Sequence, residues 1–230
     1  MGAEADRGYT GLKIRFIRRK ARARLRNEQV NLALRDAISV ERLRRYLASQ
    51  SNDLDGALRL YEWNMRLAEA FYTPLSCLEV CLRNKAHAQV AREFGADWLL
   101  QPGVPGLNDF SRSQLSEAQR KCEGTVSTGK LIAELRFAFW VGLLGPQYDG
   151  TLWRQALFRC FSPRLPRRQV HGRMNAIRRL RNRVAHHEPI FHRPCDRLHL
   201  EILEAIGWMC PKTRAWAEQQ SRVPSVLAGH

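Results

Sequence analysis

The chain has 230 residues, 44% of them hydrophobic and 26% charged, a composition typical of a folded globular protein. Lys and Arg outnumber Asp and Glu by 38 to 22, and the formal net charge of +16 predicts attraction to polyanions such as RNA. No apolar run reaches membrane-spanning length and no signal-peptide pattern is found, so we expect a cytoplasmic protein with no membrane partner.

The six cysteines form no CxxC pair, and Cys77 and Cys81 stand at helical i,i+4 spacing inside an apolar pattern. A chain of this length can bury enough surface to fold without disulfides or a structural metal. We therefore interpret the cysteines as buried thiols of a reducing compartment and expect no metal and no other cofactor.

Positive charge is dense near the N-terminus. Residues 13 to 26, KIRFIRRKARARLR, contain eight basic residues and no acid. Such a run is typical of a solvated helix or a loose arm. Two other interpretations are an arm that follows a phosphate backbone and a mitochondrial transit peptide.

From residue 39 onward the apolar spacing is helical nearly throughout. Ser39 is expected to cap one helix and Asp53 the next. Thr73 and Pro74 predict the start of a third helix, because proline is favoured at the first helical position, and Gly95 predicts its end.

The remaining segments are also predicted from spacing and composition. In chain order they are a loop (95 to 112), a helix (113 to 123), a central buried helix (130 to 145), an amphipathic helix (151 to 161), a long helix (167 to 187) and closing helices from Pro194. No segment shows the alternating pattern of a strand with a hairpin turn, so the predicted fold class is all-α.

No linker separates two self-sufficient halves of the sequence. We therefore predict one helical domain over residues 39 to 221, preceded by a basic N-terminal extension (1 to 38) and followed by a tail (222 to 230).

Between Asp149 and Glu188 the sequence contains no acidic residue but many arginines. A solvated helix face usually mixes both signs, and guanidinium groups bind phosphate in a planar, bidentate manner, so this interval predicts an RNA-binding surface. A generic basic face is the alternative. The arginines predicted to bind RNA are Arg167, Arg168, Arg173, Arg178, Arg179 and Arg183.

The string LRNRVAHHEP, residues 180 to 189, offers groups for chemistry on RNA. His186 could exchange a proton with a ribose hydroxyl, and Arg181 could stabilise charge on a phosphate. Five helical positions turn about 140°, so the two side chains of one chain would not meet, and a site shared by two copies about a two-fold axis is predicted. A purely structural helix end is the alternative.

Arg181 and Asn182 followed by His186 resemble the RxxxxH motif of HEPN domains. Further stretches resemble the Abi-like (abortive-infection, Abi_2) family, over roughly residues 39 to 210: SVERLRRYL (39 to 47), ALRLYEWNMRLAEAFYTPLSCLEVCLRNKAH (57 to 87), FWVGLLGPQYDGTLWRQAL (139 to 157) and IRRLRNRVAHHEPIF (177 to 191).

The resemblance implies a HEPN-like helical bundle, usually a homodimer, with metal-independent endoribonuclease activity in phage defence or toxin–antitoxin regulation. It implies that Arg181, Asn182 and His186 are catalytic. His187 is an adjacent candidate whose role the motif does not fix.

A similar string, LRNKAHAQ, occupies residues 82 to 89. Glu79, Arg83 and His87 lie at i,i+4 steps on one helix face. We predict that Glu79 and Arg83 form a structural ion pair. The alternative is that both line the catalytic cleft as supporting residues.

Three functions compete at this point. The first is an RNA-cleaving effector of phage defence, and the second a non-catalytic RNA-binding module that scaffolds a small regulatory RNA. The third is a helical interaction domain for an acidic protein. A steep fall of affinity with salt would favour RNA, and substitution of His186 separates cleavage from binding.

Overall fold

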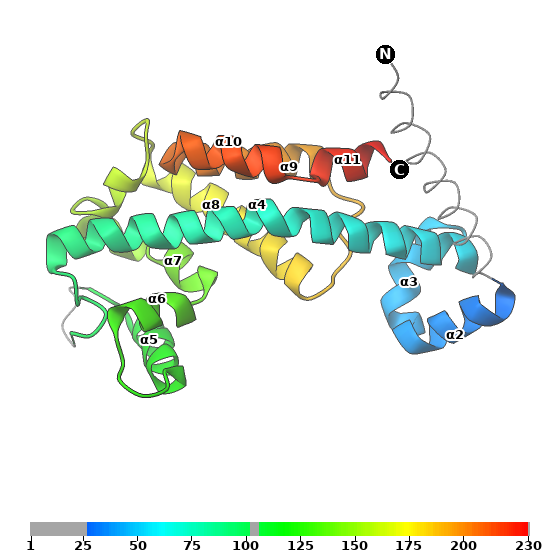
Figure 1. Cartoon of the computed structure of the whole chain (residues 1–230), viewed down its shortest axis with the longest axis horizontal. Helices are drawn as coiled ribbons and strands as arrows, with labels where there is room; N and C mark the ends of the chain where they lie inside the picture. The colour runs from blue at the N-terminus through cyan, green and yellow to red at the C-terminus, as the bar shows by residue number, and fades with distance from the viewer. Residues whose placement is uncertain (1–26, 102–105, 230) are drawn as a thin grey trace, which may run out of the picture. The chain divides into compact units, whose positions relative to one another are not determined.

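The computed structural model describes residues 27–101 and 106–229 (Figure 1). These residues form helices and turns and contain no strand, which confirms the all-α class. In this part of the chain no helix has the length and apolar character needed to cross a membrane. The basic run from 13 to 26 lies outside the described residues.

The chain divides into two compact units, the first ending at Trp63 and the second beginning at Asn64. The described end of the predicted N-terminal extension is helical, because α2 spans Glu28–Ile38. The predicted C-terminal tail also contains a helix, α11 (Val223–Ala228).

Side-chain caps define the helix starts of the first unit. Ser39 precedes α3 (Val40–Ser49), and its hydroxyl accepts the N–H of Arg42 at 3.3 Å. Asp53 precedes α4 (Leu54–Phe94) and accepts the N–H of Gly56 at 3.0 Å. Both caps were predicted. A short polar side chain at this position accepts hydrogen bonds from backbone N–H groups of the first turn, which have no partner within the helix.

The helix α4 runs without a break for 41 residues, so the predicted start of a new helix at Pro74 is wrong. Proline removes one backbone donor and costs about 3 kcal/mol inside a helix. The buried side chains Phe71, Leu75 and Leu78 keep one helical phase across it. Each contributes about 1.5–3 kcal/mol on burial, so packing outweighs the local cost.

The second unit contains two short helices where one central helix over 130 to 145 was predicted. They are α6 (Thr128–Glu134) and α7 (Phe137–Gly142), separated by Leu135 and Arg136 in extended conformation. The break lets α6 pack against α5 (Asp109–Lys121) while α7 packs against α8 (Arg167–Ala185). The predicted burial holds for α7, whereas α6 buries only Leu131. Tertiary contacts divide the segment.

The predicted amphipathic helix over 151 to 161 is also irregular. It consists of a π-helical turn, η2 (Asp149–Trp153), and a 3₁₀ turn, η3 (Leu157–Cys160). The long helix α8 spans Arg167–Ala185, and its predicted apolar stripe is buried from Val170 to Leu180.

The chain closes with three helices, orange to red in Figure 1. They are α9 (Cys195–Met209), α10 (Pro211–Gln220) and α11, and both α10 and α11 pack against α9.

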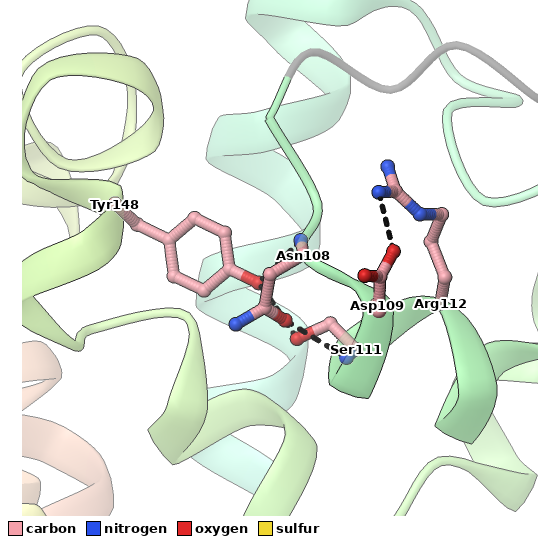
Figure 2. Close-up of polar contacts among 5 residues, drawn as sticks. All are labelled: Asn108, Asp109, Ser111, Arg112 and Tyr148. Carbon is pink, nitrogen blue, oxygen red and sulfur yellow. Dashed lines mark hydrogen bonds and ion pairs between the residues drawn. The ribbon is translucent and has the colours of Figure 1, made fainter.

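A buried polar network anchors α5 to η1 (Pro146–Tyr148), as Figure 2 shows. The fully buried Tyr148 hydroxyl lies 2.9 Å from Asn108 Oδ1 and 2.7 Å from Ser111 Oγ. It also accepts the Asn108 N–H at 3.2 Å. Asn108 in turn caps α5 by accepting the Ser111 N–H at 2.9 Å, and the helix begins four residues before the predicted position.

We expect Tyr148→Phe to lower the free energy of unfolding by about 1–3 kcal/mol, because it leaves buried polar atoms without a partner. The exposed pair Asp109–Arg112, also in Figure 2, provides the control. Its disruption by Arg112→Ala should cost no more than about 1 kcal/mol. Urea unfolding measures both, and equal losses would contradict the role given to the network.

Burial lowers the pKa of three histidines, His87, His171 and His199. For His199 the Glu218 carboxylate opposes this effect in part. His199 is buried, and its Nε2 atom has no hydrogen-bond partner among the described residues. A proton on this ring would therefore be poorly solvated.

We expect the protein to lose stability as the pH falls from about 6.5 toward 5. Below the ordinary histidine pKa the unfolded chain binds protons that the folded chain excludes, which favours unfolding. Urea midpoints at several pH values between 7.5 and 5 measure the effect, and His199→Gln should weaken it. A midpoint that stays constant over this range would contradict the prediction.

Candidate functional site

The candidate residues lie at the end of α8, which a Schellman motif terminates. His187 has a φ of 56°, and its N–H donates to the Val184 carbonyl at 3.2 Å. The next N–H, from Glu188, donates to the Arg183 carbonyl at 2.8 Å. These two bonds satisfy carbonyls that the helix end leaves open. The left-handed backbone of His187 therefore gives this residue a structural role.

His186 is the last residue before this turn. Its N–H donates to the Asn182 carbonyl at 2.9 Å, so the backbone still follows the helix. The His186 side chain is exposed and that of Asn182 is half-buried. An exposed imidazole at a fixed helix end can exchange a proton with a bound ligand.

Arg181 makes an ion pair with a residue 102 positions away. Its Nε lies 3.3 Å from Glu79 Oε2, and the two side chains are 40% and 23% exposed. The pair joins α8 to α4, which cross in Figure 1. The ion pair predicted between Glu79 and Arg83 is therefore wrong. The Nε of Arg83 is buried without a hydrogen-bond partner among the described residues.

Arg181 and His186 take different directions within one chain. The guanidinium of Arg181 reaches α4, whereas His186 is exposed at the end of α8. Five positions on a helix correspond to a rotation of about 140°, as the sequence predicted.

Several arginines predicted to bind RNA have partners inside the chain. Arg167 donates to Asp149 at 2.9 Å, which is the main cause of the lowered pKa of that carboxyl. Arg173 pairs with Glu204 at 2.6 Å and lies 5.4 Å from the ring centroid of Trp208. These two side chains hold contacts within the fold, because each guanidinium has a carboxylate partner inside the chain.

Arg178 and Arg183 make local contacts. Arg178 donates to Asn175 Oδ1 at 3.0 Å, and Arg183 pairs with Glu188 at 2.8 Å. In both cases the partner lies within about one and a half helical turns along the chain. These bonds therefore order the two arginine side chains along α8.

Arg168 and Arg179 are exposed, and the described residues provide no hydrogen-bond or ion-pair partner for either. They are eleven positions apart, and His186 follows seven positions later. These spacings are close to three and two full turns, so the three residues share the outward face of α8. We call Arg168, Arg179 and His186 the outer stripe.

His87 belongs to the core rather than to the site. Its Nδ1 accepts the indole N–H of Trp98 at 3.0 Å, and the two rings are stacked with centroids 6.3 Å apart. This contact accounts for a histidine in the earlier LRN string without a catalytic role.

Asn64 is a residue that the sequence analysis missed. It is only 3% exposed, and its Oδ1 accepts the N–H groups of Ile190 at 2.7 Å and Phe191 at 3.1 Å. It thereby fixes the segment that follows the end of α8. A lone amide inside the apolar stripe of α4 is the signal that could have identified it, because buried amides need partners.

All six cysteines are free thiols, with Cys160 and Cys195 buried and the others half-buried. Burial raises the pKa of Cys160 to about 12 and that of Cys195 to about 11, which makes both poor metal ligands and nucleophiles. Among residues 27–101 and 106–229, no three His, Cys, Asp or Glu side chains are placed to hold one metal ion.

Comparisons of the chain with protein-family models, with curated proteins and with solved structures found no match. The fold and the site define the class of protein: an all-helical protein with an arginine-rich helix that ends in an exposed histidine.

Proposed function

We propose that the chain is a metal-independent endoribonuclease whose active site is shared by two copies. His186 exchanges protons with the RNA, Arg181 stabilises charge on the phosphate, and Asn182 supports them. The resemblance to the Abi-like family suggests the setting, an abortive-infection or toxin-like effector of phage defence.

The reaction needs only these groups. One imidazole takes the proton of a ribose 2′-hydroxyl, whose oxygen then attacks the adjacent phosphorus. The same imidazole, now protonated, returns the proton to the departing 5′-oxygen, and the product ends in a 2′,3′-cyclic phosphate. A guanidinium beside the phosphate stabilises the extra negative charge of the transition state.

The observation that carries the proposal is the position of His186. It is exposed at the end of a helix that has no acidic residue, and it shares the outward face of this helix with Arg168 and Arg179. The ion pair of Arg181 with Glu79 is partly exposed, and such pairs contribute at most about 1 kcal/mol. A phosphate can therefore replace the carboxylate as the partner of this guanidinium.

The test is cleavage of a mixed RNA pool in excess EDTA by the wild type, Arg181→Ala and His186→Ala. We expect the wild type to leave 2′,3′-cyclic ends and both variants to lose this activity. Glu79→Gln is the matched control, since it removes the ion pair but keeps Arg181. If Glu79→Gln loses as much activity as Arg181→Ala, the arginine acts only through its ion pair. Equal cleavage by all four proteins would overturn the proposal.

A non-catalytic RNA-binding protein is the second candidate, and the outer stripe favours it. Two exposed arginines on one helix face can contact phosphates without any chemistry. Salt-sensitive RNA binding by the wild type and by His186→Ala, with no cleavage by either, would select this function.

A further inference from the structure

A surface pocket of about 300 Å³ lies in the segment between η2 and α8. Its lining residues are Trp153, Arg154, Phe158, Arg164 and Leu165. This volume is at the lower end for ligand sites, so the pocket suits one small planar group rather than a folded partner.

Two of the side chains that line the pocket, Trp153 and Phe158, are aromatic. Trp153 is 8% exposed, and Phe161 stacks on it at a centroid distance of 5.8 Å and an interplanar angle of 25°. Phe158 is half-exposed and presents the second ring. Nucleobases stack on such rings whatever their identity, because every base has a π-face.

Two guanidinium groups lie over the Phe158 ring. Arg164 and Arg159 lie over Phe158, with 5.5 Å and 5.0 Å between the guanidinium carbon and the ring centroid. Arg159 is paired with Glu93 at 3.1 Å. The described residues provide no carboxylate partner for the exposed Arg164, so its charge is available to a ligand.

Arg154, at the edge of the pocket, contributes further positive charge. Its partner is Asp149 at 2.9 Å, and this carboxylate also binds Arg167. One carboxylate therefore balances two guanidiniums, and a net positive charge remains beside the pocket.

We infer that this pocket binds one unpaired nucleotide of single-stranded RNA. The base stacks on Phe158 beside the indole of Trp153, and the adjoining phosphate pairs with Arg164 and Arg154. The inference rests on the proposed function only in assigning the nucleotide to RNA.

The helix α8 connects this pocket to the proposed cleavage site. Its 19 residues correspond to a length of about 28 Å. Arg168 and Arg179 face outward along this length, so a strand of several nucleotides can contact the pocket and His186 together. The pocket would then select single-stranded over double-stranded RNA, because only an unpaired base can enter it.

The experiment measures binding of a single-stranded 2′-O-methyl oligoribonucleotide, which cannot be cleaved through its 2′-oxygen. The full chain is compared with Phe158→Leu and Arg164→Gln. Loss of one stacked base should weaken binding roughly 5- to 150-fold in Phe158→Leu. Phe158→Tyr keeps the ring and should bind like the wild type. Arg164→Gln, an exposed substitution with little risk to the fold, should also weaken binding.

A second measurement locates the bound base. An oligonucleotide with one 4-thiouridine is irradiated with the protein, and the cross-linked peptide is identified. We expect a cross-link within residues 153 to 165. Cross-links confined to α8, or unchanged affinity in both Phe158→Leu and Arg164→Gln, would overturn the inference.

Competition experiments exclude other sources of the same chemistry. If phosphotyrosine or free 5′-AMP occupies the pocket while the oligonucleotide does not, the assignment to RNA is wrong. Failure of the two proposals can be told apart. If the wild type cleaves RNA but Phe158→Leu and Arg164→Gln bind the oligonucleotide normally, only the nucleotide pocket is refuted. If the oligonucleotide cross-links within the pocket but the wild type does not cleave RNA, only the ribonuclease activity is refuted.

Discussion

Mixing Arg181→Ala chains with His186→Ala chains is expected to restore RNA cleavage, although each variant alone is inactive. If two copies share the site, a mixed dimer combines the intact Arg181 of one chain with the intact His186 of the other. After random exchange, roughly half of the dimers are mixed, and each mixed dimer has one intact site of two. We therefore expect roughly a quarter of the wild-type rate.

The expected change is large because loss of a general acid or base lowers the rate about 10²- to 10⁴-fold. Mixing each single variant with the double variant Arg181→Ala/His186→Ala is the control and should restore nothing. A site within one chain predicts no recovery in any mixture. Cleavage of a labelled RNA, followed after the chains have been allowed to exchange, provides the measurement.

Asn64→Ala is expected to lower the free energy of unfolding by about 2–4 kcal/mol. The substitution leaves the buried N–H of Ile190 and the N–H of Phe191 without their acceptor. It should also reduce RNA cleavage, because this segment fixes the chain directly after His186.

Asn84→Ala is the matched control, since Asn84 is exposed on the same helix, and its stability should change by less than about 0.5 kcal/mol. Urea unfolding and RNA cleavage of both variants measure the difference. Equal stability of the two variants would show that Asn64 does not hold this segment.

The sequence predictions were correct where the interacting residues lie close together along the chain. The caps at Ser39 and Asp53 and the buried stripe of α8 were predicted correctly. In each case the relevant groups lie within one or two turns, so residue spacing contains the information.

Helix continuity was decided by packing. Pro74 has the local signal of a helix start, yet α4 continues through it. The apolar segment from 130 to 145 has no such signal and nevertheless breaks after Glu134. In both cases burial against other helices outweighs the local preference, and spacing does not show which helices will pack together.

The site shows the same division. The sequence by itself determined the charge of the arginine-rich interval and the positions of Arg181 and His186 on one helix. Only the tertiary structure assigned Glu79 to Arg181 across 102 positions and Asn64 to Ile190 across 126. It also distinguished Arg167, which pairs inside the fold, from Arg168, which is exposed. The physical reason is that an ion pair or a buried hydrogen bond depends on distance in space, which the fold sets after the local helices have formed.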